Sequence, residues 1–289
     1  MKKIFVLTAL YAMVILMSLQ SAYAQTDSGQ KQFAKTKVGE VEIITLVDNS
    51  SEFDISIFDG DKTLREQLSS GKKLPASINA FLVKKGDSLI LVDTGIGKQL
   101  LENIKAAGFQ PEQINAIILT HTHGDHTGGL LQNSQAAFPN ATLWLSQKEL
   151  AYWQSQNLRY ADLCKKMYNG LKFIVQDEKT PLIIPEMTAI AIEGHTPGHT
   201  ALLIRSQNEG AILIGDLLHS VTLQFAYPDI CANFDADKPK AIAARKKLLK
   251  LAADEKLLIA GAHIPFPAFG KVKIQGDGFQ FAPAPLKNP

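Results

Sequence analysis

Short runs of apolar residues, separated by polar turns, recur along most of this chain. Their length and their content of branched residues are typical of buried strands. The expected strands are residues 41–47, 78–83, 88–92, 114–120, 141–145, 187–192, 201–204, 211–214 and 257–260. Many short strands with helical segments between them predict a layered α/β domain.

Three segments carry the signals of helices. Residues 98–107 and 237–253 have apolar positions at helical spacing. Ser146 and Glu149 form the Ser-x-x-Glu pattern of a capping box, so a helix is expected to begin directly after the strand at 141–145. Strands and helices recur in both halves of the chain without a fixed repeat, in agreement with the α/β class.

Polar clusters follow five of the apolar runs at their C-terminal ends. They are Asp93, residues 121–126, His195, Asp216 and His263. In open sheets, ligand sites form beyond the carboxyl ends of the strands, where side chains from several strands converge. We therefore expect the five clusters to meet in one crevice at the sheet edge.

The first residues indicate a secretory signal peptide. A basic start is followed by an apolar stretch over residues 4–19 and by a small-residue cleavage site before Gln25. An uncleaved anchor is the alternative, because the stretch is long for a signal and short for a membrane span. We expect a periplasmic or secreted protein without stable membrane association after cleavage. The expected division is a signal peptide at 1–24, a polar leader at 25–37 and one domain at 38–289.

The charge balance and the cysteine content exclude two classes of protein. The net charge is +2, and it comes from Lys2 and Lys3 of the signal, so the mature chain is neutral. A neutral chain gives no reason to expect nucleic acid as a partner. Cys164 and Cys231 do not form a disulfide framework, and whether they pair stays open.

The densest candidate chemistry lies at residues 121–126. Three of the chain's seven histidines fall there, in the order His121-Thr122-His123-Gly124-Asp125-His126. Imidazole and carboxylate ligands at this density suit zinc. A turn at Gly124 would let the first two histidines serve one ion and the last two ligands serve its neighbour. A solvated polar loop is the alternative.

This His-x-His-x-Asp-His motif resembles the signature of the metallo-β-lactamase superfamily. The other parts of that pattern follow in order: Asp93-Thr94-Gly95, Gly194-His195-Thr196-Pro197-Gly198-His199, Gly215-Asp216 and Gly261-Ala262-His263. The resemblance covers nearly all of the chain after the signal. It implies a four-layered αβ/βα sandwich with its metal site at the sheet edge.

The resemblance also implies two Zn²⁺ ions per chain and a possible homodimer. The implied ligands are His121, His123 and His195 on the first zinc, Asp125, His126 and His263 on the second, and Asp216 bridging both. The superfamily's iron-binding flavoproteins usually carry glutamate at the place of His123, so a histidine favours zinc over iron.

A dinuclear zinc site predicts hydrolysis by a metal-bridged hydroxide, which needs no serine or cysteine nucleophile. Asp125 and His219 are the candidate catalytic residues. His219 lies near the place of a tyrosine that binds the substrate carbonyl in related lactonases, and it could polarise a carbonyl or protonate a leaving group. A buried core histidine is the alternative. His199 is expected to have a supporting role, and Asp93 to orient a ligand imidazole.

The C-terminal third resembles the methyl parathion hydrolase branch. The matching stretches are Gly215–His219, Gln224-Phe225, Asp235-Ala236-Asp237, Ala244-Arg245-Lys246-Lys247 and Ala262–Pro267. That branch hydrolyses phosphotriesters, and its members and neighbours open lactones and aryl esters. We expect a small hydrophobic lactone, such as an acyl-homoserine lactone, or an aryl ester as substrate. An organophosphate triester is the alternative.

An apolar pocket for such a substrate could be built from Phe225, Phe234, Phe266 and Phe269, with core packing as the alternative for each.

Three other functions fit the residues less well. Zinc β-lactamases lack the bridging aspartate that Asp216 provides. A glyoxalase II would act on cytosolic thioesters and carry a basic helical C-terminal domain, whereas this chain has a signal and no such segment. A zinc-binding protein without catalysis would usually have lost ligands, and here all seven positions are filled.

Overall fold

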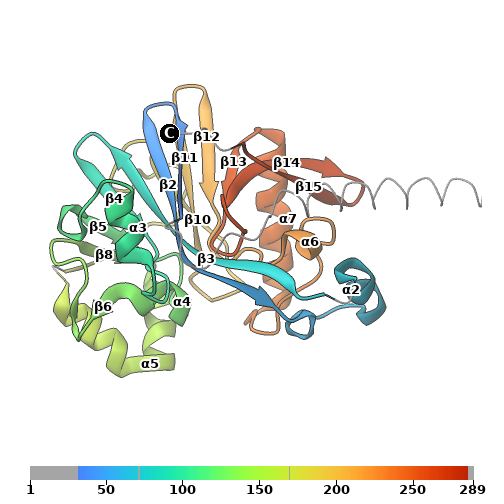
Figure 1. Ribbon diagram of the computed structural model, residues 1–289, viewed down its shortest axis with the longest axis horizontal. Helices are drawn as coiled ribbons and strands as arrows, with labels where there is room; N and C mark the ends of the chain where they lie inside the picture. The colour runs from blue at the N-terminus through green and yellow to red at the C-terminus, as the bar shows by residue number, and fades with distance from the viewer. Residues whose placement is uncertain (1–31, 71, 169, 286–289) are drawn as a thin grey trace, which may run out of the picture. The chain divides into compact units, whose positions relative to one another are not determined.

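Two sheets carry the fold in the computed structural model, which describes residues 32–70, 72–168 and 170–285 (Figure 1). One sheet has seven strands in the order β1-β2-β3-β4-β5-β8-β9, with the bounds Phe33–Val38, Val41–Phe53, Leu74–Lys85, Ser88–Val92, Ala116–Ile118, Thr142–Leu145 and Leu171–Phe173. The other has six strands in the order β10 to β15, with the bounds Met187–Ala191, Thr200–Ser206, Glu209–Leu213, Leu258–Ala260, Phe269–Gln275 and Gly278–Pro283. A separate hairpin joins β6 (Leu131–Gln132) and β7 (Gln135–Ala136).

Helices occupy the connections between the strands. The longer ones are α2 (Lys62–Ser69), α3 (Leu100–Ala106), α5 (Gln147–Met167) and α7 (Lys238–Asp254), and the shorter ones are α4 (Gly124–Thr127), α6 (Val221–Gln224) and the 3-10 turns η1 (Ile55–Ile57), η2 (Pro111–Gln113) and η3 (Gly128–Leu130). Side-chain caps define the starts of the two longest helices. Ser146 accepts from the backbone N–H of Glu149, and Asp237 accepts from that of Lys240.

The elements form four layers. Val83 and Ile118 of the first sheet share a core with Leu202 and Leu213 of the second, so the sheets pack face to face. On the outer face of the first sheet, α3 and α5 bury residues such as Ile104 and Trp153. On the outer face of the second sheet, α7 buries Leu248 and Leu249. These layers confirm the predicted αβ/βα sandwich (Figure 1).

The polar clusters do follow strand ends, as predicted. Asp93 follows β4 and His121 follows β5, its parallel neighbour in the first sheet. Asp216 follows β12 and His263 follows β13, which are parallel neighbours in the second sheet. His195 lies between β10 and β11. Parallel neighbours end at the same sheet edge, so the two sheets deliver these side chains to one place.

Strands β2 and β3 extend beyond the runs that the sequence predicts. Their pairing continues from Asn49↔Ile78 to Phe53↔Leu74, after a register shift between Val47 and Asn49. We call this extension, residues 49–53 and 74–78, the β2–β3 arm. The register shift marks Asp48, which accepts hydrogen bonds from the backbone N–H groups of Ile96, Gly97, Gln99 and Leu100. Asp48 thereby holds the loop that follows Asp93.

The N-terminal boundary of the domain differs from the prediction. Residues 33–37, expected in a polar leader, form most of β1, which pairs with β2. Ala34 and Val38 are buried, whereas Lys35 and Lys37 are exposed. Lysines are common on exposed edge strands, and here they gave the segment the polar composition that predicted a leader.

Three further findings concern the compartment and the cysteines. The predicted signal peptide, residues 1–24, lies outside the described residues. Within the described ranges, no helix has the length and apolar character needed to cross a membrane. Cys164 and Cys231 are both buried free thiols.

Candidate metal centre

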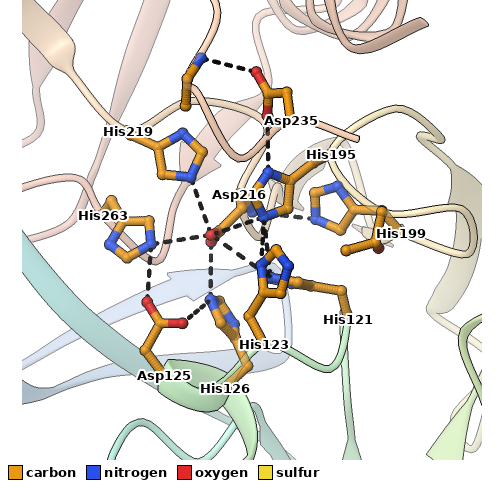
Figure 2. Close-up of polar contacts among 12 residues, drawn as sticks. His121, His123, Asp125, His126, His195, His199, Asp216, His219, Asp235 and His263 are labelled. Carbon is orange, nitrogen blue, oxygen red and sulfur yellow. Dashed lines mark hydrogen bonds and ion pairs between the residues drawn. The ribbon is translucent and has the colours of Figure 1, made fainter. Parts of the chain in front are cut away.

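The fold brings all seven predicted ligands into one cluster (Figure 2). One group of donor atoms comes from His121, His123, His195 and Asp216, and the other from Asp125, His126, Asp216 and His263. Within each group the donor atoms lie within 4.8 Å of one another. Asp216 belongs to both groups, so the arrangement could hold two metal ions that share one carboxylate.

Three ring nitrogens of the first group converge on one point. Nε2 of His195 lies 2.9 Å from Nδ1 of His123, and Nε2 of His121 lies 3.1 Å from the same atom. The two Nε2 atoms are 3.2 Å apart. Neighbouring nitrogens around a tetrahedral zinc would be separated by about 3.3 Å, given Zn–N bonds of about 2.0–2.1 Å. The donor set therefore fits zinc.

The Asp216 carboxylate lies between the two groups. Its Oδ2 is 3.0 Å from Nε2 of His263 and 3.4 Å from Nε2 of His195, and its Oδ1 is 3.0 Å from Nε2 of His126. Within the described chain, Asp216 Oδ1 and His126 Nε2 are buried without a hydrogen-bond partner. Buried polar atoms normally have partners, and a cation would supply one to both atoms.

Groups behind the cluster fix the orientation of its rings. Three rings donate from Nδ1 to an acceptor 2.8 Å away: His126 to the Asp93 carboxylate, His195 to the Asp235 carboxylate and His263 to the Ser77 carbonyl. Because these contacts keep one proton on Nδ1, each Nε2 presents a lone pair to the cluster in the metal-binding, neutral form of the ring. Asp93 thus contacts a ring, as predicted. It has a left-handed backbone, with φ of 60°, and such strained residues concentrate at functional sites.

Burial and charge act in opposite directions on the rings. Burial, together with the neighbouring His195, lowers the pKa of His123 to about 4. Burial would also lower the pKa of His195, but Asp216 and Asp235 raise it to about 9. His195 must therefore release a proton when its Nε2 binds a metal, which couples metal affinity to pH.

His199 lies behind the cluster. Its Nε2 accepts a hydrogen bond from the backbone N–H of Asp216 at 3.1 Å, so the ring helps to place that carboxylate. The contact requires glycine at 215, because φ there is 49° and a Cβ atom would lie 2.5 Å from His199 Nε2. This is the supporting role that the sequence suggested.

His219 lies beside the cluster. Its Nε2 is 3.1 Å from Asp216 Oδ2, and its ring stacks on His263 with centroids 4.9 Å apart. The edges of two aromatic rings surround it: Phe234 at 4.8 Å and Phe53 at 6.3 Å between centroids. His219 therefore lies against two of the predicted ligands, Asp216 and His263, and close to two phenylalanines.

Core packing, the favoured interpretation of each phenylalanine alone, is confirmed for three of the four residues that could have built an aromatic pocket. Phe225 is buried in the core beside α7, and Phe269 is buried between the sheets with Phe266 packed against the same core. Phe234 does contact the cluster and is 43% exposed. Phe53 of the β2–β3 arm, which was not predicted from the sequence, is the second phenylalanine beside the cluster. Closeness in sequence to a ligand does not tell which face of the chain a side chain occupies.

Two carboxylates at the site were not recognised from the sequence as site residues. Asp235 accepts a hydrogen bond from His195, whereas the sequence indicated it only as part of the resemblance to the methyl parathion hydrolase branch. Glu149 was assigned to a capping box, and its backbone N–H does bond the Ser146 side chain. The Glu149 side chain, however, contacts Thr122 and Thr196, which are neighbours of predicted ligands.

The sequence profile of the metallo-beta-lactamase superfamily matches residues 74–263. The chain belongs to this superfamily. The chain is similar to metallo-hydrolases of this superfamily, and lactonases are among its named relatives. This agrees with the fold and with the donor groups described above.

Two solved structures of this superfamily share 30% of their sequence with the chain. AidC, a dizinc quorum-quenching lactonase in complex with a product, has a TM-score of 0.81 and covers 91% of this chain and 100% of its own. The hydrolase AbOPH has a TM-score of 0.79 and covers 90% of this chain and 99% of its own. An N-acyl homoserine lactonase of a Bacillus species is 24% identical over 227 residues, which are 70% of this chain and 86% of that protein.

Proposed function

We propose that this protein is a dinuclear zinc hydrolase that opens hydrophobic lactones of the acyl-homoserine-lactone type. The observation that carries the proposal is the pair of donor groups sharing Asp216. Lactonases among the relatives, one of them dizinc, support the substrate class. The shared aspartate also disfavours a β-lactamase.

The two donor groups assign the ligands of each ion. His121, His123 and His195 would hold the first zinc, Asp125, His126 and His263 the second, and Asp216 would bridge them. When bound, the two ions supply a Lewis acid for the carbonyl and a water activated near neutral pH. Asp125 is the more accessible carboxylate, with its side chain 30% exposed against 2% for Asp216. We place it on the side that the substrate reaches.

The side chains around the cluster would bind and orient the lactone. Phe234 and Phe53 offer apolar ring surface on either side of His219, which suits an acyl chain. His219 Nδ1 is buried and has no hydrogen-bond partner among the described residues. The nitrogen that faces the cluster is Nε2, beside Asp216 Oδ2, and burial lowers the pKa of the ring to about 4. The neutral ring would therefore assist the departing ring oxygen, which is a poor leaving group as an alkoxide, by donating a hydrogen bond.

Replacing His219 by alanine should lower kcat on lactones by ~10²-fold, the low end for a lost general acid. Phosphotriesters with a nitrophenol leaving group need no such acid and should lose less. The measurement is kcat on both substrates for the wild type and the variant, with zinc content checked in each. Equal losses on both substrates, or no loss on either, would make His219 a packing residue.

Replacing Phe234 by alanine should raise KM for long-chain acyl lactones by about tenfold, equal to about 1.4 kcal/mol of lost binding. Short-chain lactones should change little, because they do not reach the ring. KM measured across a series of chain lengths checks this. Phe173→Ala is the matched control, since that ring is 47% exposed on strand β9 at the edge of the first sheet. A uniform KM change across the series would contradict the assignment.

A substrate screen tests the proposal as a whole. Zinc-loaded protein is assayed on lactones, aryl esters, phosphotriesters and β-lactams, and acyl-homoserine lactones should give the highest kcat/KM. A preference for phosphotriesters would favour the organophosphate hydrolase alternative. Two bound zinc ions without hydrolysis of any class would indicate a non-catalytic zinc-binding protein.

We also propose export, on the strength of the signal-like pattern over residues 1–24. Mature protein from the native host should then begin at or near Gln25. N-terminal sequencing decides this, and an intact Met1 in a cytosolic fraction would rule it out.

A further inference from the structure

A buried carboxylate beside the first donor group accepts four hydrogen bonds. Oε1 of Glu149 accepts from the backbone N–H of Thr122 at 2.9 Å and from its hydroxyl at 2.8 Å. Oε2 accepts from the hydroxyl of Thr196 at 2.7 Å and from the backbone N–H of Gly198 at 3.0 Å. The side chain is fully buried. One carboxylate oxygen therefore bonds Thr122, and the other bonds Thr196 and Gly198.

These two segments carry all three histidines of the first donor group. Thr122 lies between His121 and His123, and Thr196 directly follows His195. The first segment follows β5 of the seven-stranded sheet, and the second joins β10 and β11 of the six-stranded sheet. Glu149 thus connects ligand loops that belong to different sheets.

The four donors require a side chain at position 149 that accepts hydrogen bonds at both of its terminal atoms. An ionised carboxylate is an acceptor at both oxygens and matches four donors, whereas an amide presents an NH₂ group to two of them. Burial raises the pKa of Glu149, and the hydrogen bonds from Thr196, Thr122 and Gly198 oppose that rise. A buried acceptor with this number of partners is costly to replace.

Capping of α5 does not explain this side chain. Ser146 Oγ caps the helix by accepting from Glu149 N–H, and its hydroxyl also donates to the Gly198 carbonyl at 2.9 Å. A Cβ atom at Gly198 would lie 2.3 Å from the Glu149 backbone nitrogen. The start of α5 is thus packed directly against the loop after His195, and the Glu149 carboxylate extends onward from it to Thr122.

We propose that Glu149 is a positioning residue that joins the two histidine loops of the first metal site and holds them in the binding arrangement before metal arrives. It touches neither substrate nor a donor atom of the cluster and acts through Thr122, Thr196 and Gly198. The inference rests on the proposed zinc centre for its consequence, which is tighter binding of the first ion. Its structural part, the link between the loops, can be tested without metal.

Glu149→Gln is the main variant, because it keeps the size of the side chain and changes one acceptor oxygen into a donor. The zinc affinity of the first site should fall by about 10–100-fold, the usual effect of losing a group that orients metal ligands. Zinc retained against a chelator gives this number without any activity assay. Thr196→Val should have a smaller effect, and Thr196→Ser, which keeps the hydroxyl, should restore wild-type affinity.

Hydrogen exchange of the metal-free proteins tests the link itself. Peptides covering residues 119–124 and 194–200 should both exchange faster in Glu149→Gln, while Thr196→Val should accelerate the second peptide alone. Asp48→Asn is the matched control: it changes another buried carboxylate with four donors, and it should accelerate residues 95–101 instead. Unchanged exchange of both peptides and unchanged zinc affinity in Glu149→Gln would overturn the proposal. If the wild type bound no zinc, the proposed function would fail, and the exchange data would still decide whether Glu149 links the loops.

Discussion

Replacing Asp216 by alanine is expected to lower the zinc content from two ions per chain to at most one and to reduce lactone hydrolysis by about 10³-fold. Asp216 lies close to donor atoms of both groups, at 3.4 Å from His195 Nε2 of the first group and 3.0 Å from His126 Nε2 of the second. A carboxylate between two dications offsets their repulsion, so its loss weakens the second ion most. The expected factor corresponds to about 4 kcal/mol, in line with the several kcal/mol that a metal ion contributes to charge stabilisation.

Zinc analysis and kcat/KM on the same preparations test this result. Asp235→Asn is the control, because Asp235 also contacts a ring of the cluster but from its far side, at His195 Nδ1. That variant should bind zinc more weakly by about 10–100-fold and regain two ions when zinc is in excess. An Asp216→Ala protein with two tightly held ions and full turnover would refute the bridging role.

Replacing Arg245 by methionine is expected to destabilise the fold by about 3–5 kcal/mol, the usual cost of breaking a buried charged pair. The guanidinium is fully buried on α7. It donates to the carbonyls of Leu217, Pro228 and Ile230 at 2.7, 2.8 and 2.9 Å and lies 3.6 Å from the Asp235 carboxylate. Methionine fills much of the volume, but it removes a donor from three buried carbonyls and the positive charge beside the Asp235 carboxylate.

The Tm should fall by about 10 °C, given about 2–4 °C per kcal/mol for a domain of this size. Arg205→Met provides the matched control, because Arg205 forms an exposed pair with Glu255. Exposed pairs contribute about 0–1 kcal/mol, so this variant should unfold close to the wild type. Equal Tm values for the two variants would show that the buried guanidinium contributes no more than a surface charge.

The candidate metal ligands could be identified from the sequence because their signal is local. Residues 121–126 place four candidates on one loop, and His195, Asp216 and His263 each follow an apolar strand that is recognisable by itself. The four-layered architecture followed from the family resemblance that these motifs carry. The structure then brought all seven side chains together.

The residues that support the ligands could not be predicted in the same way, since their partners are distant in sequence. Glu149 bonds Thr196 across 47 positions, and Ser77 accepts from His263 across 186. The Ser146-x-x-Glu149 pattern even favoured a local function for Glu149. Phe53 reaches the site because the β2–β3 arm continues past a register shift, and polar residues at 48–52 concealed that continuation.

The candidate ligands of each proposed ion come from both sheets, and this has a consequence for unfolding. His121 and His123 follow β5, whereas His195 and Asp216 belong to the other sheet. A bound ion therefore acts as a cross-link between two halves of the chain, each with its own core against its helices. The ions bind only the folded arrangement, because the ligands of each site are separated in the unfolded chain, as His121 and His195 are by 74 positions. Withdrawing the metal should then let the halves melt in separate steps, with the region around residues 182–285 and that around residues 33–175 distinguishable by hydrogen exchange.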